Sequence, residues 1–487
     1  MHKRIAALIL AGVMSMMLLA GCDKYTTPQL DPNRPVLIQF WHHYNGYQKT
    51  VVDKLVEQFN RTEGLEQGIV VEAHHQGNVL ELHQKVLDAA HGKLGAEPLP
   101  HLITTYADTA YELGDQGLLV QLRSYFTQQE LDAFNSSFLQ EGDADADGIV
   151  EVLPVSKSSE VLAINQGMWG KFASETGASL QQLSTVEGLV DVARQYYQWI
   201  DSKTPDVPND GKAFYSWEST ANYLLTGSMQ LGQPLIEEGT AGRVWVNLNK
   251  EVMRKLWDNY HCPMIMGWMD DGTATALDSV RVADTVGAVI SSSHAAYFPD
   301  QMYLDDFKSF SVTPTVLAVP QFESGTPTVM QQGAGMAIVK SDDAQEYAAS
   351  LFLKWCTQPE RNAVYALESG YLPTTQEALT PQALNRALKQ QQESRQPLIE
   401  AVIDMTLQQM NECQVYVSKG LDGAREVREV LESFLKDTAK ADRAVVEEQL
   451  SQGVSLQEAT QWFMSDEYFD QWYSQLEQKL ARATGGN

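Results

Sequence analysis

Strand and helix patterns alternate in the N-terminal part of the chain, and this alternation is the strongest constraint on the fold. The run Val36–Trp41 is almost continuously apolar, which is typical of a strand buried on both faces. Further strand patterns stand at 69–73 and 101–106, and apolar residues at helical spacing fill the intervals, in 51–59 and 79–90. This β-α-β-α-β order predicts a parallel sheet with right-handed crossovers, whose ligands bind beyond the carboxyl ends of the strands.

The rest of the chain adds one more clear strand pattern and several helices. Met336–Val339 is predicted to be a strand, followed by a helix that Ser341 caps and whose apolar face runs from Ala344 to Trp355. From about Thr380 onward the chain is rich in Gln, Glu, Leu and Ala, so we expect mostly helix there. The 487 residues leave room for two or three domains, and the predicted fold class is α/β with a helical C-terminal region.

The charge balance excludes one class of partner. The chain has 35 Lys and Arg against 63 Asp and Glu, a net charge of -28, which repels phosphate backbones and anionic lipid surfaces. We therefore expect no nucleic-acid partner. Hydrophobic residues make up 44% and charged residues 20% of the chain, which is the composition of a folded globular protein.

The N-terminus has the pattern of an export signal. Lys3 and Arg4 precede an uncharged run, Ile5–Ala20, which is shorter than the roughly 20 residues of a membrane-spanning helix. We predict a signal peptide over residues 1–21. The sequence Leu-Ala-Gly-Cys that ends at Cys22 resembles the bacterial lipobox, in which the cysteine is cleaved and lipidated, so this residue is the predicted lipid anchor.

A plain secretory leader is the alternative to this lipoprotein signal. Residues 22–35 contain three prolines and no apolar periodicity, which is expected of a tether between a lipid anchor and a folded body. No later stretch is apolar and long enough to span a bilayer. The sequence therefore predicts attachment to the membrane through the lipid anchor alone.

The remaining cysteines do not predict a disulfide framework. Cys262, Cys356 and Cys413 are odd in number, widely spaced and without a CxxC pair, so at most one bridge could form. They also lack the spacing of a structural zinc site.

Two clusters contain residue types that bind metals. Asp143, Asp145 and Asp147 with Gly148 match the first half of a calcium loop, but Pro154 stands where the bidentate glutamate belongs. We predict a solvated acidic turn there, with calcium as the alternative. The second cluster consists of histidines near two strand ends and in one helix: His42, His43, His74, His75 and His83. Adjacent histidines occur more often in loops than as pairs of metal ligands, so we do not predict a metal site there.

Common catalytic signatures are missing from the sequence. It contains no GxSxG elbow, no Walker-type GxxxxGK, no HExxH and no GxGxxG after the first strand. We predict a protein without enzymatic activity and without a cofactor. A glycoside hydrolase stays open as an alternative, because the 63 acidic residues could assemble a carboxylate pair in space without a local motif.

Short segments along most of the chain occur in the same order as similar segments in a known protein family. Besides the lipobox they are Ile38–His42 with Gly46, Phe59–Asn60, Gln76–Asn78, Gly117–Leu122, Leu153–Pro154 running to Ile164–Asn165, Gly287–Ser293, Gly333–Gly335 and Gly370–Pro373. In these segments the chain resembles the bacterial ABC-transporter extracellular solute-binding proteins of the carbohydrate and glycerol-phosphate type.

The resemblance implies a two-lobed periplasmic-binding-protein clamshell with a hinge between the lobes. Lobe one would comprise residues 36–147 and 317–360, and lobe two residues 148–316 and 361–487. The cleft would close on a small-molecule ligand, and the closed form would dock on the transmembrane subunits of an ABC permease. The resemblance further implies a monomer, lipid-anchored at the extracytoplasmic face of the cell membrane.

A sugar cleft combines aromatic rings, on which the C–H faces of sugars stack, with polar side chains that bond to the hydroxyls. Trp41 is predicted to be buried instead of facing the cleft. Residues at the ends of the first three strands supply both types of side chain: His42, His43, Tyr44, Gln76, Asn78 and Tyr106. The resemblance adds candidate residues from the rest of the chain: Ser158, Ser159, Trp217, Ser292, Ser293, Gly333 and Tyr371.

Two positions bear on the ligand. Members of the family that take glycerol phosphates carry a tyrosine and an acidic residue where this chain has Val79 and Ala107, although Asp108 is adjacent. Lys419 and Arg425 are the candidates for a phosphate grip. We therefore predict a sugar or oligosaccharide, with glycerol 3-phosphate or a related phosphodiester as the alternative. A surface adhesin, which would use an exposed apolar patch, is a further alternative.

Overall fold

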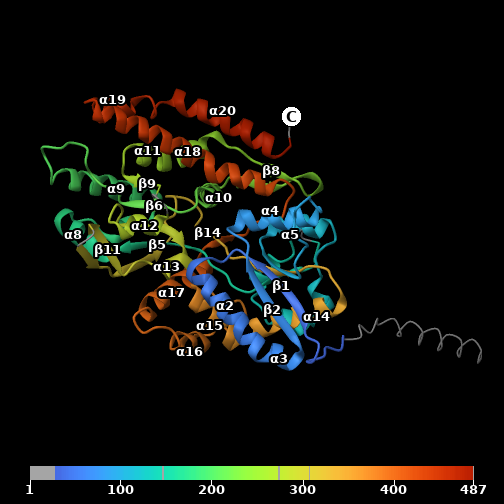
Figure 1. Ribbon diagram of the computed structural model, residues 1–487. Helices are drawn as coiled ribbons and strands as arrows, with labels where there is room; N and C mark the ends of the chain where they lie inside the picture. Colours follow the sequence, from blue (N-terminus) through green and yellow to red (C-terminus); the bar gives the residue numbers. More distant parts are fainter. Residues whose placement is uncertain (1–27, 145–146, 272–274, 306–307, 486–487) are drawn as a thin grey trace, which may run out of the picture.

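The computed structural model describes residues 28–144, 147–271, 275–305 and 308–485. Figure 1 shows two α/β bodies side by side, each built around its own five-stranded sheet. The predicted signal peptide, Cys22 and the first part of the tether lie outside the described residues. Within the described ranges, no helix combines the length and apolar character needed to cross a membrane.

The first sheet contains the predicted N-terminal strands. Its order is β2 (Ile69–His75), β1 (Val36–His42), β3 (Leu102–Thr105), β15 (Gly335–Ile338) and β4 (Val152–Pro154). Strand β1 pairs in parallel with β2 and β3, which confirms the parallel arrangement expected from the alternation. Strand β15 is antiparallel to both β3 and β4, so the complete sheet is mixed. We call the body around this sheet the first lobe.

Helices cover both faces of the first sheet. The predicted apolar stripe of α2, from Val51 to Phe59, is buried, and Phe59 packs against Phe352 and Trp355. The cap of α14 is Asp342 and not the predicted Ser341, because the Asp342 carboxylate accepts from two free backbone N–H groups of the first turn. The helices are α2 (Gly46–Arg61), α3 (Glu63–Gln67), α4 (Val79–Ala90), α5 (Ala107–Asp115), α6 (Gln128–Asp132), α7 (Ser136–Gln140), α14 (Asp343–Cys356) and α15 (Pro359–Ser369).

The second sheet has the order β13 (Pro314–Ala318), β5 (Glu160–Asn165), β10 (Gly287–Ser291), β6 (Tyr215–Trp217) and β9 (Met269–Asp270). Strand β5 is antiparallel to both of its neighbours, whereas β10, β6 and β9 run parallel to one another. Residues 160–165 are all buried, as expected of a central strand covered on both faces. We call the body around this sheet the second lobe.

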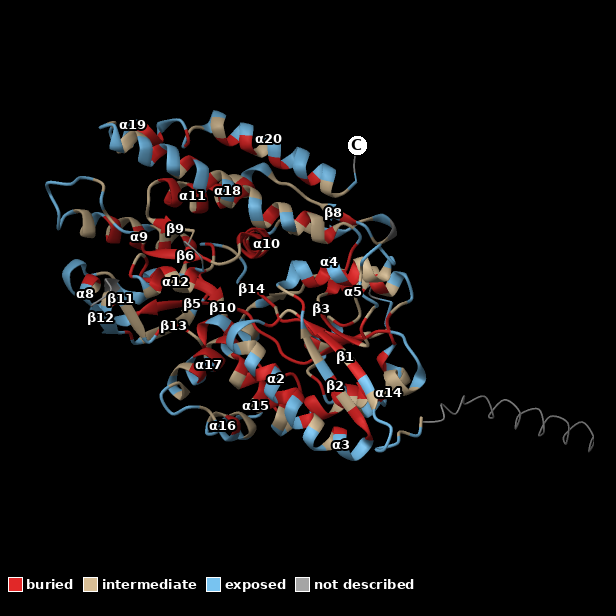
Figure 2. Ribbon diagram, in the orientation of Figure 1, coloured by how far each residue is buried: buried red, intermediate tan, exposed pale blue. Residues whose placement is uncertain are grey.

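Helices make up most of the second lobe, and the region from about Thr380 onward is mostly helical, as predicted. Helix α10 is buried over most of its length, and α18 lies across it with α20 as the outermost layer (Figure 2). The helices are α8 (Gln166–Thr176), α9 (Val186–Asp201), α10 (Thr220–Gln230), α11 (Lys250–Ile265), α12 (Ala276–Arg281), α13 (Ser292–Ala295), α16 (Pro381–Leu388), α17 (Gln396–Glu412), α18 (Ala424–Ser451), α19 (Leu456–Gln461) and α20 (Asp466–Ala483).

Short two-stranded pairings complete the structure. They join β7 (Ile236–Glu238) to β8 (Val244–Val246), β11 (Gln301–Asp305) to β12 (Lys308–Ser311), and β14 (Thr328–Met330) to β16 (Gln414–Tyr416). Three-residue to five-residue 3₁₀ helices stand at Leu122–Ser124, Leu180–Ser184 and Thr240–Gly242. The three cysteines that the structure describes are free.

The chain passes between the sheets through segments that pair with one another. The backbone N–H of Lys157 donates to the Leu372 carbonyl at 3.0 Å, and that of Ser158 donates to the Gln332 carbonyl at 2.9 Å. Strand β4 lies in the first sheet although it follows the expected lobe boundary at residue 147, and β13 of the second sheet ends at Ala318, after the expected boundary at 317. These paired segments form a connection between the lobes, which we call the crossing.

Candidate functional site

A cavity of about 430 Å³ lies between the lobes, within the range of about 300–1,000 Å³ that is usual for small-molecule sites. The first lobe contributes α4, the start of α5 and a residue after α7, and the second lobe contributes α10 and the start of α18. The lining residues are Val79, Leu80, His83, Tyr106, Ala107, Asp108, Thr109, Glu141, Asn222, Leu225, Ile236, Met330, Gln331, Gln332, Tyr416, Ser418, Lys419, Ala424, Arg425, Arg428, Glu429 and Glu432.

The first turn of α4 forms one part of the first-lobe wall. Asn78 caps this helix, since its side-chain oxygen accepts from the Glu81 N–H at 2.9 Å and the Glu81 carboxylate accepts from the Asn78 N–H at 2.8 Å. The helix therefore begins at Val79, and Val79 and Leu80 are exposed. Because both of these side chains are apolar, this part of the wall offers a surface for packing and no hydrogen bonds.

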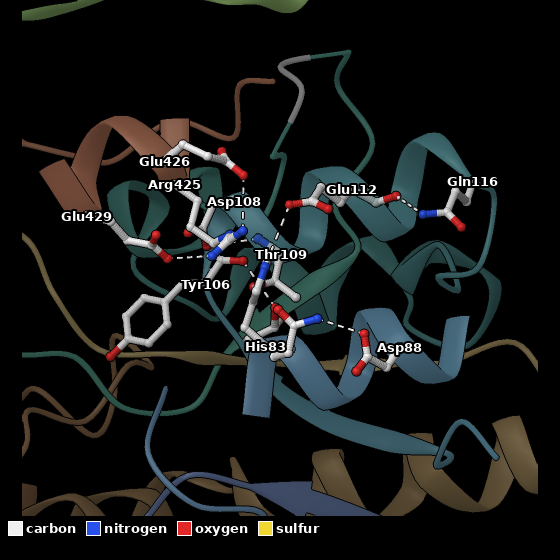
Figure 3. A network of polar contacts seen from close by, with 12 residues as sticks. His83, Asp88, Tyr106, Asp108, Thr109, Glu112, Gln116, Arg425, Glu426 and Glu429 are labelled. Carbon is white, nitrogen blue, oxygen red and sulfur yellow. Dashed lines mark hydrogen bonds and ion pairs between the residues drawn. The ribbon is translucent and has the colours of Figure 1, made fainter. Parts of the chain in front are cut away.

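The start of α5 forms the second part of the first-lobe wall. The Thr109 N–H donates to the Asp108 carboxylate at 2.8 Å. The Thr109 hydroxyl lies 2.6 Å from Nδ1 of His83, which is buried in α4. Figure 3 shows these side chains facing Arg425 of the second lobe. The hydrogen bonds thus join α4 to α5 directly behind the cavity surface.

Burial lowers the pKa of His83 below its usual value. The positive charge of Arg425 lowers this pKa further, whereas the carboxylates of Asp108 and Glu426 raise it. The net shift favours the neutral imidazole at neutral pH. The histidine is therefore a hydrogen-bonding wall residue and not a cation for an anionic ligand.

One face of α18 forms the second-lobe wall. Ala424, Arg425, Arg428, Glu429 and Glu432 recur at three- and four-residue spacing, which places them along one side of a helix. The Arg425 guanidinium lies 3.0 Å from the Glu426 carboxylate and is also paired with Glu429 (Figure 3). Arg425 therefore reaches the cavity with its charge already balanced by two carboxylates.

Two further residues of this face are fixed by α10. The Arg428 guanidinium donates to the Asn222 side-chain oxygen at 2.6 Å. The Glu432 carboxylate accepts from the Ser219 hydroxyl at 2.6 Å and from the Ala221 N–H at 3.0 Å, at the N-terminus of α10. A carboxylate at a helix N-terminus is stabilised by the free N–H groups and by the helix dipole. The charged wall is thus rigidly held.

A buried carboxyl group stands behind this wall. The Asn222 amide donates to Glu160 at 3.0 Å, and Glu160 is the first residue of β5, next to the crossing. Burial raises the pKa of Glu160 to about 7, with the Asn222 hydrogen bond opposing that shift. A chain of hydrogen bonds therefore runs from Arg428 in the cavity to the crossing between the lobes.

Glu141 connects the cavity to the crossing from the first lobe. Its carboxylate lies 2.7 Å from the Lys157 ammonium, and both side chains are almost fully buried. The same carboxylate accepts from the Gln331 amide, and Lys157 also donates to the Gly333 carbonyl at 2.9 Å. The arrangement satisfies the buried charges, as a buried ion pair requires.

The predicted first-lobe site residues lie around one end of the first sheet. Tyr106 lines the cavity, and its ring centroid is 6.0 Å from that of His43. His42 and Tyr44 are buried, and the His43 imidazole is hydrogen-bonded to Thr104 at 3.0 Å. Gln76 accepts from Lys85, and Asn78 caps α4 as described above. Trp41 is buried in the first lobe, as predicted.

The predicted second-lobe and crossing residues are mostly buried. The Ser159 N–H donates to the Ser292 hydroxyl at 3.1 Å. Trp217 packs edge-to-face on Tyr223, with ring centroids 4.8 Å apart, in the core of the second lobe. The members of this set are buried side chains or backbone at the crossing and do not line the cavity: Ser158, Ser159, Trp217, Ser292, Ser293, Gly333 and Tyr371. Their contact with a ligand stays a prediction.

The backbone explains why residue 333 is a glycine. Its φ is +103°, and a Cβ there would lie 2.6 Å from the Ser156 carbonyl oxygen. The residue therefore permits the close approach of two crossing segments.

Sequence reasoning missed most of the second-lobe wall. Asn222, Arg428, Glu429 and Glu432 carried no local motif, although Arg425 was noted as an anion candidate. One sequence feature could have indicated them. Charged residues stand at three- and four-residue spacing near the start of the helix that became α18, and the end of a helix can line a cleft.

The acidic turn shows no metal-binding geometry in its described part. The Asp143 carboxylate accepts from the Gly148 N–H at 3.0 Å and that of Asp147 accepts from the Ile149 N–H at 2.7 Å, while Asp145 lies outside the described residues. Across the described ranges, no group of three or more His, Cys, Asp or Glu could hold a metal ion.

Two α/β lobes, a paired crossing and a cavity between the lobes together define a two-lobed binding protein of the periplasmic-binding-protein type. A sequence profile described as bacterial extracellular solute-binding protein matches residues 54–390. The chain therefore belongs to the bacterial extracellular solute-binding proteins, a family that acts outside the cytoplasm. A comparison with curated proteins finds no match.

Solved structures share the fold at low sequence identity. UgpB from Mycobacterium tuberculosis, in complex with glycerophosphocholine, matches with a TM-score of 0.65 and 15% identity over 92% of this chain and 99% of that one. The maltose/maltodextrin-binding domain MalE from Bdellovibrio bacteriovorus, bound to maltotriose, matches with a TM-score of 0.63 and 15% identity over 91% of this chain and 100% of that one. The cyclic alpha-maltosyl-1,6-maltose binding protein from Arthrobacter globiformis matches with a TM-score of 0.60 and 16% identity over 92% of this chain and 100% of that one.

Proposed function

We propose that this protein is the substrate-binding lipoprotein of an ABC importer and that it captures a sugar or oligosaccharide between its lobes. The observation that carries the proposal is the cavity of about 430 Å³ to which both lobes contribute polar side chains. Sugar hydroxyls donate and accept hydrogen bonds, and the lining provides carboxylates, amides and guanidinium groups for both roles. The rings of Tyr106 and Tyr416 supply the aromatic surface for the C–H faces.

The charges of the lining favour a neutral ligand over a phosphate. Arg425 is paired with two carboxylates, and the Lys419 ammonium lies 3.6 Å from the Glu238 carboxylate. The lining also includes the carboxyl groups of Asp108 and Glu432. An anion would compete with these carboxylates for the same cations, whereas a neutral polyol would bond to both kinds of group.

Closure of the lobes would commit the ligand to transport. Gly420 lies where the two walls meet, and a Cβ there would stand 2.6 Å from the Ala107 carbonyl oxygen and 2.8 Å from that of Ala144. Only a residue without a side chain allows this approach. Contacts made by the ligand to both walls would shift the population toward the closed form, which would dock on the permease subunits.

The anchor and the lobe boundaries belong to the same proposal. Lipid on Cys22 would hold a monomer at the extracytoplasmic face, with residues up to 35 as the tether. The two lobes would rotate about the crossing, with the predicted bounds, 36–147 with 317–360 and 148–316 with 361–487, changed so that β4 and α15 belong to the first lobe and all of β13 to the second. Release of a Cys22→Ala variant from the membrane fraction would support the anchor, and its retention there would contradict it.

A thermal-shift screen of the purified protein tests the proposal. Sugars, oligosaccharides, glycerol 3-phosphate and glycerophosphodiesters would each be added, and binding at a hundredfold excess over Kd raises the free energy of unfolding by about 2.7 kcal/mol. We expect a shift with one sugar class. A shift with phosphates alone would favour the alternative ligand, and turnover of a chromogenic glycoside would favour a hydrolase. The absence of any shift would favour a surface adhesin.

A further inference from the structure

The last part of the predicted tether is docked on the first lobe. Residues 30–35, which we call the strap, lead into β1, and Leu30 packs against the hydrophobic core of that lobe. Two hydrogen bonds fold the strap into a turn, since the Arg34 N–H donates to the Asp31 carbonyl at 2.9 Å and the Asn33 N–H donates to the Asp31 carboxylate at 2.9 Å. The strap is therefore a fixed part of the first lobe and not a free linker.

Gly68, at the turn between α3 and β2, makes room for the strap. Its φ is +75°, and a Cβ there would lie 2.6 Å from the Asp31 carbonyl oxygen and 2.8 Å from the Pro32 nitrogen. The Gly68 carbonyl also accepts from the Val36 N–H at 2.9 Å, where the strap enters β1. Only a residue without a side chain permits both this backbone conformation and this contact.

The strap and the cavity stand at opposite ends of the first sheet. The strap precedes β1 and α3 precedes β2, whereas the cavity residues Val79 and Ala107 follow β2 and β3. Strand β1 alone has seven residues and spans roughly 23 Å. Figure 1 shows α3 at the end of the first lobe that points away from the second lobe. We call this end, formed by the strap and α3, the base.

The strap shortens the chain that joins the first lobe to Cys22. The eight residues from Cys22 to Leu30 span at most about 29 Å when extended, whereas with the strap released the fourteen residues to Val36 span up to about 50 Å. A globular chain of 487 residues is about 60 Å across. For the cavity end to face a membrane, the base would have to stand about that far from it. The short connection excludes this inverted orientation.

The charges of the base do not attract anionic lipid by themselves. Among the described residues, the strap and α3 carry three acidic residues, Asp31, Glu63 and Glu66, against the single basic residue Arg34. Binding to an anionic lipid surface through charge takes a cluster of Lys and Arg. The length of the connection, and not surface charge, therefore decides how the base lies relative to a membrane.

Building on the proposed function, which makes Cys22 the lipid anchor, we infer that the docked strap holds the base against the phospholipid surface and directs the cavity away from it. In this orientation the cavity is open to ligands from the surrounding medium. Contact of the cavity end with membrane-embedded subunits then requires the strap to leave Gly68, which adds about 20 Å of reach. The strap is thus a device that separates ligand capture from delivery.

Energy transfer from two labelled positions to the membrane tests the inference. The lipid-anchored full chain is placed in vesicles of phosphatidylethanolamine and phosphatidylglycerol that contain a rhodamine acceptor lipid. The donor dye is attached at Leu65→Cys in the base or at Trp462→Cys in the second lobe, both exposed, in a Cys262→Ala and Cys413→Ala background. We expect transfer from position 65 to exceed that from position 462 by about twofold or more, because the connection keeps the base within about 29 Å of the membrane. Equal transfer from membrane-bound protein would overturn the inference.

Two variants release the strap. Gly68→Ala places a Cβ against it, and Leu30→Asp removes its packing on the core, so each should lower the ratio of the two transfer efficiencies by about half. The matched control is Gly92→Ala, where φ is +59° and nothing lies within 4 Å of the new Cβ, and it should keep the wild-type ratio. An unchanged ratio in both folded release variants would overturn the inference. Protein that stays off the vesicles in every form would instead contradict the lipid anchor of the proposed function, and the inference with it.

Discussion

The two walls of the cavity between the lobes differ in both chemistry and origin. The first-lobe wall is made of residues that directly follow strands or begin helices, and it includes the apolar side chains of Val79, Leu80 and Ala107. The second-lobe wall is one face of α18, which carries Arg425, Arg428 and other charged residues far along the chain. The difference indicates that the apolar part of the first-lobe wall supplies shape, whereas the α18 face supplies charged groups for hydrogen bonds. The predictions below test that division.

Acid should affect the first lobe most strongly. Burial lowers the pKa of His42 and of His43 to about 4 each, against 6.5 in the unfolded chain. At these two histidines the unfolded state therefore binds more protons between pH 6.5 and 4, so their contribution to the free energy of unfolding should fall as the pH falls. We expect a loss of about 2 kcal/mol per histidine at pH 5, measured by denaturant unfolding.

Variants assign this acid effect to the two histidines. His42→Leu and His43→Asn should each make the loss of stability between pH 7 and pH 5 smaller by about 2 kcal/mol. The exposed His91 provides the control, and His91→Gln should keep the full difference. If the pH dependence were the same in all three variants and in the wild type, another group would be responsible.

Contact between the walls should control affinity. A Cβ at Gly420 would meet the carbonyl oxygens of Ala107 and Ala144 on the first lobe. We expect Gly420→Ala to hold the lobes apart and to weaken binding of the preferred sugar by about a hundredfold, which is about 2.7 kcal/mol. Calorimetry measures the affinity. Gly170→Ala, at a position with nothing within 4 Å, should bind normally; full affinity of Gly420→Ala would show that the walls need not meet.

The second lobe should respond to pH in the opposite direction. The pKa of Glu160 is about 7 in the folded protein and about 4.5 in the unfolded chain, so the folded state holds the extra proton between these values. The contribution of Glu160 to the free energy of unfolding should fall by about 2 kcal/mol as the pH rises through this window, which opposes the contribution of the two histidines. Unfolding curves of Glu160→Gln should lack that decline. A decline of equal size in the variant would exclude Glu160 as its source.

The smallest effect should come from the apolar part of the first-lobe wall, at the first turn of α4. Val79 is exposed at the start of α4, and Val79→Ala removes packing surface without removing a hydrogen bond. We expect affinity to fall by about threefold, against about thirtyfold for Arg428→Ala in the second wall. Calorimetry of both variants with the same sugar makes the comparison. Equal losses would contradict the division between a shaping wall and a bonding wall.

The first lobe was the part of the fold most open to prediction. The helix expected over 79–90 is α4 with the same bounds, and the strand expected at 69–73 lies within β2. These elements could be predicted because the buried stripe of each one is local in sequence. The antiparallel entry of β15 next to β3 could not be predicted, since strand pairing depends on contacts between distant segments.

The candidate site was predicted less well for the same reason. Tyr106 was found because it ends a strand, where a parallel sheet places its ligands. Trp217 and Ser292 have the residue types of a sugar site, yet packing against Tyr223 and hydrogen bonds at the crossing bury them. Residue type alone does not reveal whether a side chain faces a cavity or a core.

The sequence by itself determined the α/β elements of the first lobe, the helical C-terminal region and, through ordered segments, the solute-binding family. These features follow from apolar periodicity and local motifs, which are written along the chain. Only the tertiary structure decided that α18 faces α4 and α5, that Glu141 pairs with Lys157 beside the cavity, and that Gly420 lies against Ala107 and Ala144 of the first lobe. The physical reason is that a cavity is defined by the close packing of segments that are distant in sequence, and no local pattern encodes that packing.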